Sequence, residues 1–333
     1  MKSKNVYVIA EIGLNHDGSI EKAIKMVNQA KESGADAVKF QTFKTEYLLN
    51  PITFNGNKRD YNSIYDKLKE VEIDEYFHKR IKEETKKLGI DFISSVFDPE
   101  SLETVEKYCD IIKVASSEIT NLDLLEKIGK TSKKVILSTG MATMGEIEKA
   151  IFTLLKGGSS NISLLHCVSL YPLDPELANL RVIKTLYKAF KLPVGFSDHS
   201  LGDTLAIAAV ALGAVIIEKH VTLKRENRLF DHPHSMEFDE LKKMIDKIRE
   251  IESALGDGVK KISAKEMEIK KSSLRSIFAK RDIKAGETLN DTNIKGVRPL
   301  IGIPVEMKFM LNGAKVNKDI SKDSPIFWED IVW

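Results

Sequence analysis

The stretch PVGFSDHSLGDTLAIAAVALGAVIIEKHVT (residues 193–222) holds two short apolar runs that end in polar residues, with a longer segment between them. Short β-branched apolar runs are typical of buried strands, and a longer intervening segment is typical of a covering helix. The same alternation extends from residue 6 to about residue 255. It predicts eight strands: VYVIAEIG (6–13), ADAVKFQT (35–42), IDFISSVF (90–97), IIKVAS (111–116), KVILSTG (134–140), ISLLHCVS (162–169), PVGFSDH (193–199) and AVIIEKHVT (214–222).

The order of these units predicts the fold class, α/β. Continuous apolar strands, each followed by a covering helix, require parallel pairing with both faces of the sheet buried. Eight such units over about 250 residues match a closed (β/α)₈ barrel, the TIM barrel. An open doubly wound sheet is the alternative, and it is disfavoured because no GxGxxG turn follows the first strand.

Two segments depart from the repeat. Residues 43–72 follow the second strand and are rich in Asn, Lys and Tyr, which predicts a long polar loop able to act as a lid or substrate loop. After residue 258 the pattern changes to short strands and turn residues. We therefore expect a barrel domain over residues 1–258, a Lys-rich linker over 259–272, and a small separate domain over 273–333.

The total charge is nearly balanced, with 51 Lys and Arg against 49 Asp and Glu. This balance does not indicate nucleic acid or an acidic membrane as a partner, so a bound anion needs a local site. Cys109 and Cys167 lie in apolar runs without CxxC spacing, which predicts core packing in a reducing compartment. The apolar run after Lys4 is too short for a signal peptide, and no stretch is long enough for a membrane span. We expect a cytoplasmic protein.

Polar residues crowd the predicted carboxyl ends of the strands, where a TIM barrel forms its active site. Burying so many ionisable groups is costly unless they pair with each other, a metal or a ligand. Glu11 and Glu118 are available as general acid or base. Two cations and four hydroxyls suit a small phosphate or carboxylate: Lys39, Lys113, Ser95, Ser116, Ser138 and Ser197.

Histidines near the ends of the last two strands are candidate metal ligands. His199 and His220 occupy equivalent positions on adjacent strands, and two imidazoles leave a divalent ion open positions for water and substrate. The alternative, equally supported by the spacing, is a neutral pair hydrogen-bonded to Asp198 and Glu218. His232 and His234 in the DHPHS loop form a weaker candidate metal pair.

Seven motifs and a tail pattern carry a family resemblance: IAEIGLNHDGSIEKA, GADAVKFQTF, IKVASSEITN, LSTGM, LLHCVSLYP, GFSDHS and IEKHVT, followed by RDIKAGETL and VRP. In this order they resemble the sialic acid synthase family. The resemblance implies a TIM barrel with a C-terminal antifreeze-like domain, also called an SAF domain, in a domain-swapped homodimer. It also implies condensation of phosphoenolpyruvate with an open-chain N-acylated hexosamine, such as N-acetylmannosamine, to a nonulosonic acid and phosphate. The implied cofactor is Mn²⁺ or Mg²⁺.

The family roles carry over to individual positions. The resemblance implies metal binding by His199 and His220, and phosphoenolpyruvate binding by the two lysines and four serines named above. It implies that Arg298 of the VRP motif enters the partner's barrel. Acceptor-sugar contacts are implied for Glu11, Gln41, Glu118, Tyr171 and Asp231.

Departures from the family pattern leave the acceptor sugar open. Ser169 replaces a common Asn, and Leu229 and Phe230 replace a common Gly-Pro before Asp231. A legionaminic, pseudaminic or spore-coat polysaccharide precursor synthase is therefore a close alternative. A Schiff-base aldolase using Lys113 or Lys39 is an alternative of another mechanism. An ice-binding or carbohydrate-binding protein is disfavoured, because the tail is highly charged.

Overall fold

The computed structural model describes residues 5–55, 58–227 and 229–333. The basic residues 1–4, which precede the apolar run considered above as a signal peptide, lie outside this part. The chain divides into two compact units, one ending at Gly256 and the other beginning at Asp257. Each unit is described by itself.

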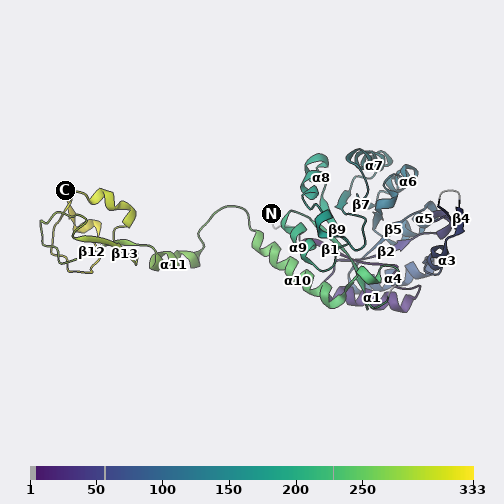
Figure 1. Cartoon of the computed structure of the whole chain (residues 1–333), viewed down its shortest axis with the longest axis horizontal. Coiled ribbons are helices and arrows are strands. Elements are labelled where there is room, and N and C mark those ends of the chain that lie inside the picture. Colours follow the sequence, from purple (N-terminus) through teal and green to yellow (C-terminus); the bar gives the residue numbers. More distant parts are fainter. Residues whose placement is uncertain (1–4, 56–57, 228) are drawn as a thin grey trace. The chain divides into compact units, whose positions relative to one another are not determined.

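The first unit is a closed barrel of eight parallel strands (Figure 1). Consecutive strands pair around the barrel, and the last barrel strand, β10, pairs with β1. The TIM barrel prediction is confirmed. The barrel strands are β1 (Tyr7–Gly13), β2 (Ala37–Thr42), β5 (Asp91–Val96), β6 (Ile111–Val114), β7 (Lys134–Ser138), β8 (Ile162–His166), β9 (Val194–Asp198) and β10 (Ile216–Thr222).

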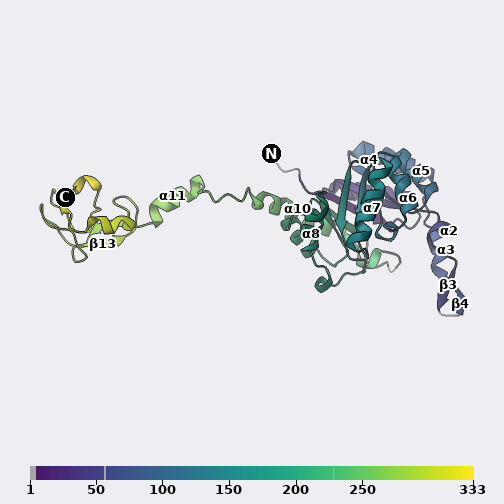
Figure 2. The same ribbon diagram turned by 90° about the horizontal axis from the view of Figure 1, so that it is seen from above.

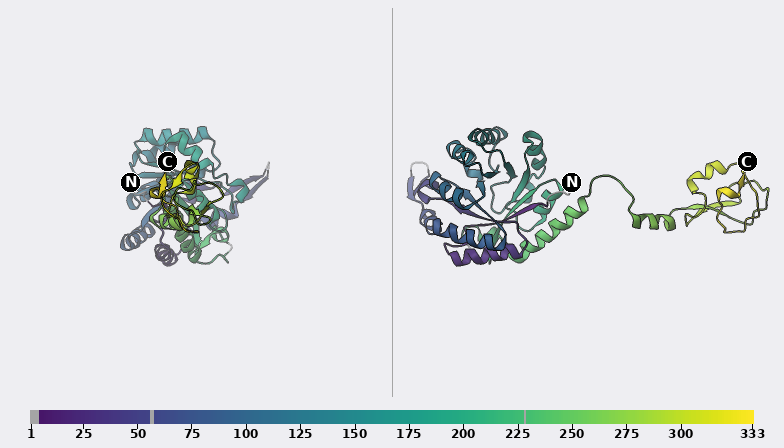
Figure 3. Two further views of the ribbon diagram at one scale, coloured as in Figure 1. Left: turned by 90° about the vertical axis from the view of Figure 1, so that its left-hand side faces the viewer. Right: turned by 180° about the vertical axis from the view of Figure 1, so that it is seen from behind.

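Eight helices surround the strands: α1 (Ile20–Glu32), α4 (Glu75–Leu88), α5 (Pro99–Tyr108), α6 (Leu122–Lys130), α7 (Met144–Gly157), α8 (Val182–Phe190), α9 (Thr204–Ala211) and α10 (Phe238–Leu255). Helix α1 illustrates why these segments form helices that pack on the barrel. Ser19 caps α1 by accepting a hydrogen bond from the Lys22 amide, and Met26 and Val27 face the core. Helices α1 and α10 lie side by side (Figure 3), so the ring of helices closes where the strands close.

Side chains inside the barrel alternate with those facing the helices, since strand residues point to opposite faces in turn. An apolar layer inside the barrel contains Ile9, Ala37, Ile93, Ile111, Ile136, Leu165 and Ile216. The next inward position on each of these strands, two residues on, lies closer to the carboxyl end. This layer of positions forms the floor of the site described below.

The segment 43–72 contains regular structure that the prediction of a polar loop missed. It forms α2 (Thr45–Leu48), the antiparallel hairpin of β3 (Ile52–Asn55) and β4 (Lys58–Tyr61), and α3 (Ser63–Lys69). The hairpin projects from the barrel, as Figure 2 shows. The two strands are only four residues long and largely exposed, so the sequence offers too short a pattern to reveal them.

The second unit has a small core of its own, built around Ile277, Ile294, Val316 and Ile326. Two antiparallel pairs form it, β12 (Ser276–Ala279) with β13 (Ile294–Val297) and β14 (Lys315–Val316) with β15 (Ile331–Val332). The expected linker contains the helix α11 (Ala264–Ser273), begun by a capping box of Ser263 and Glu266. Across the described residues, no helix combines the length and apolar character that a membrane crossing requires.

Candidate active site

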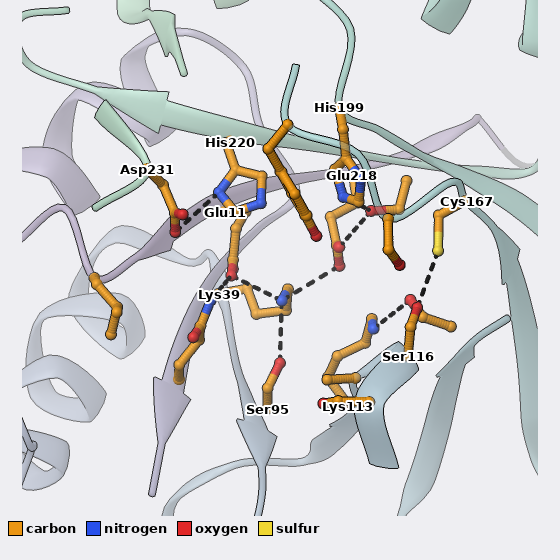
Figure 4. A pocket seen from close by; sticks show the side chains of 18 of the residues that line it. Glu11, Lys39, Ser95, Lys113, Ser116, Cys167, His199, Glu218, His220 and Asp231 are labelled. Carbon is orange, nitrogen blue, oxygen red and sulfur yellow. Dashed lines mark hydrogen bonds and ion pairs between the residues drawn. The ribbon is translucent and has the colours of Figure 1, made fainter. Parts of the chain in front are cut away.

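A cavity of about 310 Å³ opens at the carboxyl ends of the strands (Figure 4). Its position follows from the alternation inside the barrel, which places polar side chains directly above the apolar layer. It is lined by Glu11, Leu14, Lys39, Gln41, Ser95, Phe97, Lys113, Ala115, Ser116, Ser117, Ser138, Met141, Cys167, Ser169, Tyr171, Ser197, His199, Glu218, His220 and Asp231.

Lys39 lies at the centre of the polar layer. Its Nζ is 3.0 Å from Glu11 Oε1 and 3.7 Å from Glu218 Oε2, and it donates a hydrogen bond to Ser95 Oγ at 3.1 Å. Burial lowers the pKa of Lys39, but the two carboxylates outweigh it and the pKa is raised. Lys39 is therefore a permanent cation held by fixed negative charges.

Glu11 and Glu218 differ although both contact this lysine. Burial raises the pKa of Glu11, and the charge of Glu218 adds to the rise while Lys39 opposes it. The pKa of Glu218 is lowered, because Lys39, Lys113 and a 2.8 Å hydrogen bond from Ser197 Oγ outweigh its burial. Glu11 is thus the better proton acceptor, since a carboxylate with a raised pKa is the stronger base.

Lys113 is a buried cation of a different kind. Its Nζ donates to Ser138 Oγ at 2.5 Å and to the Val114 carbonyl at 2.9 Å. Among the described residues no carboxylate lies within 4.0 Å of this amine. Burial lowers the pKa of Lys113 to about 8. An anion in the cavity would supply the missing negative charge.

Ser116 stands beside this lysine at the start of the turn that follows β6. It accepts a hydrogen bond from the Gly140 amide at 3.1 Å and lies 3.1 Å from Cys167 Sγ. A Cβ on Gly140 would stand 2.8 Å from Ser116 Oγ and 2.4 Å from Ser169 Oγ, so this close approach requires glycine. The segments that carry Ser116, Gly140 and Ser169 therefore converge here.

His199 and His220 face the same cavity, with ring centroids 5.6 Å apart. Burial lowers the pKa of both rings, so both are neutral near pH 7 and keep a lone pair for a metal. His199 Nδ1 bonds the Val168 carbonyl at 2.8 Å, and its Nε2 lies 3.2 Å from Ser197 Oγ.

The alternative partners considered for these histidines bond elsewhere. Asp198 faces the helices and forms a buried ion pair with Lys219 at 2.8 Å. Glu218 bonds Ser197 rather than a ring nitrogen. The alternative interpretation, in which Asp198 and Glu218 accept hydrogen bonds from the two histidines, is therefore wrong.

The structure brings most of the predicted site residues to this one cavity. Gln41, Tyr171 and Asp231 line it together with both lysines, the four serines, Glu11 and the two histidines. Glu118 does not line it, and its carboxylate accepts a hydrogen bond from Asn121 at 2.9 Å. Arg298 belongs to the second unit, where it is exposed directly after β13.

Two ionisable residues that line the cavity were not predicted as site residues. Glu218 was considered only as a histidine partner and Cys167 only as core packing, yet both line the cavity. Counting by two along IEKHVT would have placed Glu218 and His220 on the inner face, with Lys219 outside. His234, from the weaker pair, lies beside His220, whereas His232 bonds Thr222 and Asp17.

Comparison with known proteins adds independent support. Residues 26–260 match the NeuB family and residues 275–332 the SAF domain. The N,N'-diacetyllegionaminic acid synthase of Campylobacter jejuni is 41% identical, with 97% of this chain and 99% of that protein covered. A pseudaminic acid synthase of Campylobacter jejuni is 38% identical, over 95% and 94%.

Solved structures agree with these matches. The crystal structure of N-acetylneuraminic acid synthetase from Leptospira borgpetersenii, in complex with citrate, has a TM-score of 0.73 to this chain at 37% identity. The alignment covers 80% of this chain and 90% of that one. The chain therefore belongs to the NeuB family of sialic acid and related nonulosonic acid synthases, and its C-terminal unit is an SAF domain.

Proposed function

We propose that this chain condenses phosphoenolpyruvate with an open-chain N-acylated hexosamine to give a nonulosonic acid and phosphate. The observation that carries the proposal is the buried Lys113 amine, which faces the cavity with neutral oxygens as its hydrogen-bond partners in the described part of the chain. Burying a cation without a counter-ion is costly, so the site is arranged for a ligand that brings negative charge.

The donor fits one side of the cavity. Phosphoenolpyruvate carries a phosphate and a carboxylate, and both groups accept hydrogen bonds from lysine amines and serine hydroxyls. Lys113, Ser116 and Ser138 form one cluster of such donors, and Lys39 with Ser95 forms a second. Two separate clusters support a ligand with two anionic groups.

The acceptor sugar would occupy the remaining space near Gln41, Tyr171 and Asp231. Gln41 donates to Glu11 at 3.1 Å, so it links the acceptor side to the central lysine. The cavity volume lies at the lower end of the range for small-molecule sites, about 300–1,000 Å³. A volume in this range suits small-molecule substrates.

A divalent cation, Mn²⁺ or Mg²⁺, would be held by the imidazoles of His199 and His220. The fit rests on two neutral rings that face one cavity and on Nδ1 of His220, which is buried and without a hydrogen-bond partner among the described residues. When bound, the cation supplies Lewis-acid polarisation of the aldehyde carbonyl of the acceptor.

Protein groups would carry the remaining steps. Lys39 and Lys113 hold the anionic groups of the donor while its methylene carbon bonds to the aldehyde carbon. The donor C=C bond opens in this step and leaves a cationic carbon, to which water adds while Glu11 accepts one of its protons, and that proton goes on to the former aldehyde oxygen. The carbon–oxygen bond to phosphate then breaks, and phosphate leaves with the proton of the new hydroxyl, whose oxygen becomes the keto oxygen. Glu11 is preferred to Glu118 for this role because it lines the cavity and its pKa is raised.

The decisive experiment measures phosphate release from phosphoenolpyruvate with Mn²⁺ against a panel of N-acylated and deoxy hexosamines. We expect release with at least one acceptor, and the preferred acceptor separates sialic, legionaminic, pseudaminic and spore-coat precursor synthesis. Borohydride treatment with a keto substrate serves as the second arm. A covalent adduct on Lys39 or Lys113, without metal dependence, would establish a Schiff-base aldolase instead.

A further inference from the structure

A buried ion pair on the outer face of the barrel lies one residue before each of the two histidines that would hold the cation. Lys219 Nζ is 2.8 Å from Asp198 Oδ2, and the two side chains are 2% and 0% exposed. Lys219 directly precedes His220 in β10, and Asp198 directly precedes His199 at the end of β9. Strand residues alternate between two faces, so the pair points toward the helices while the histidines point into the cavity.

Charged side chains are out of place on this face of the two strands. The other outward positions are filled by buried apolar core residues, namely Val194, Phe196, Ile217 and Val221. Taking a charge out of water costs several kcal/mol per ion, and apolar residues of similar volume are often at least as stabilising as a buried pair. The ion pair therefore needs an explanation other than stability.

The pair stands where the backbone connection between β9 and β10 ends. The parallel ladder between these strands finishes with Lys219 opposite Asp198, and both histidines follow one residue later. On its other side β10 is still paired at that level, with His220 opposite Glu11 of β1. In the described part of the chain, strand pairing thus reaches His220 from β1 but stops before His199 on the β9 side.

Side-chain contacts continue the connection past that point. Lys219 Nζ also donates a hydrogen bond to the Ser200 carbonyl at 2.5 Å. Asp198 Oδ1 accepts hydrogen bonds from the Ser200 amide at 2.9 Å and from Ser200 Oγ at 2.7 Å. One amine on β10 therefore bonds the chain on both sides of His199, and Asp198 closes the same short turn.

We propose that Lys219 and Asp198 are positioning residues for the cation site. Their ion pair, together with Ser200, extends the β9–β10 connection past the end of the ladder and fixes the separation of the His199 and His220 backbones. Buried ionic groups are retained in some proteins because they specify one arrangement of the chain. The inference rests on the proposed function, since it takes the two imidazoles as the ligands, but its readout is metal binding without either substrate.

The test titrates the metal-free full-length chain with Mn²⁺ and follows the free ion by electron paramagnetic resonance. Lys219→Met alone leaves Asp198 unpaired, whereas the double variant Asp198→Val with Lys219→Met replaces the pair by apolar residues and should recover part of the lost stability to urea. We expect Mn²⁺ affinity to fall about tenfold in both variants. This is the lower end of the loss of about 10–100-fold seen for a partner bonded to a ligand itself, because this pair acts through the backbone.

Leu125→Ala is the matched control for lost stability. Leu125 is buried on α6 and does not line the cavity, and its truncation should cost about 2–5 kcal/mol of unfolding free energy. Its Mn²⁺ affinity should stay within about twofold of that of the unchanged chain. In the double variant, phosphoenolpyruvate affinity by calorimetry should also stay within about twofold, and circular dichroism checks that each variant is folded.

The proposal is overturned if Mn²⁺ affinity recovers in the double variant, or if it falls as much in Leu125→Ala. His199→Ala and His220→Ala separate this result from a failure of the proposed function. If both histidine variants lose Mn²⁺ binding while the double variant keeps it, only the positioning role is wrong. If either histidine variant keeps its Mn²⁺ binding, the cation site of the proposed function is wrong as well.

Discussion

The two sides of the cavity carry groups of opposite electrostatic character. The lysine–serine wall (Ser95, Lys113, Ser116 and Ser138) comes from β5, β6, the turn after β6 and β7, and it presents donors to an anion. The histidine wall (His199, His220, Asp231 and His234) comes from the ends of β9 and β10 and the turn after them, and it presents lone pairs to a cation.

This contrast suggests how one barrel could hold both kinds of ligand. Lys39 stands between the walls with Glu11 and Glu218, so the centre of the site is already balanced. Among the described residues no carboxylate lies within 4.0 Å of the Lys113 amine, whereas the histidine wall contains a carboxylate of its own, Asp231, 3.5 Å from His220. Under the proposed function, an anionic donor would complete the lysine–serine wall and a cation the histidine wall, which would keep the two apart inside one small volume.

Among these predictions, removing the cation should produce the largest loss of turnover. Chelation, or His220→Ala, should lower turnover by at least about 1,000-fold, since Lewis-acid stabilisation contributes several kcal/mol. Phosphoenolpyruvate binding by calorimetry should persist in His220→Ala, because the lysine–serine wall is unchanged. Full turnover after both treatments would show that the histidine wall has no chemical role.

The lysine–serine wall is tested by Lys113→Met. Loss of a buried charged partner costs about 2–5 kcal/mol, so phosphoenolpyruvate affinity measured by calorimetry should fall about 30- to 5,000-fold. Stability to urea should not fall, because the change removes a buried cation that has no carboxylate within 4.0 Å among the described residues.

Lys219→Met is the contrasting variant. Lys219 is buried against Asp198 on the outer face of β10, so its removal should cost about 3–5 kcal/mol of unfolding free energy. The affinity of this variant for phosphoenolpyruvate should stay within about twofold of that of the unchanged chain, because Lys219 lies outside the cavity and separate sites act independently. Equal phosphoenolpyruvate affinities in Lys113→Met and Lys219→Met would show that Lys113, in the lysine–serine wall, contributes no more to donor binding than Lys219 on the outer face of β10.

A third prediction concerns Arg298 of the SAF domain and tests whether this residue contributes to acceptor binding. If Arg298 enters the barrel of a partner subunit, Arg298→Ala should lower kcat/KM for the acceptor by about 30-fold, equivalent to about 2 kcal/mol. Mixing this variant with Lys113→Met should then restore about a quarter of the sites, because half of the random dimers are mixed and each has one intact site. No recovery after mixing, in dimers shown by sedimentation to exchange subunits, would place Arg298 in its own chain's site.

The pH dependence should be the smallest effect. The pKa of Lys113 is lowered to about 8, so the amine is a cation below pH 8 and loses its charge as the pH rises through this value. Phosphoenolpyruvate affinity should therefore fall above pH 8, by at most about tenfold per pH unit. Calorimetry between pH 7 and pH 9.5 measures it, and Lys113→Met should flatten the profile. An unchanged profile in that variant would assign the titration to another group.

Periodicity explains why the barrel and most of the site could be predicted. Each strand is short and apolar and the helices between them are regular, so eight repeats leave few arrangements that bury all the strands. The same period of two carries Lys39, Lys113 and His220 into the cavity from three different strands. The helices and hairpin of residues 43–72 carry no such period, which is why they were missed.

Local alternation of apolar and polar residues was enough to predict the closed barrel, the separate tail domain and the cations, hydroxyls and imidazoles at one end of the barrel. Only the tertiary structure decided the partners. Glu218 joined Glu11 on Lys39, Lys113 was left with neutral oxygens, and a turn without periodicity brought His234 beside His220. Pairings of this kind depend on distances between segments far apart in the chain, and local patterns do not encode those distances.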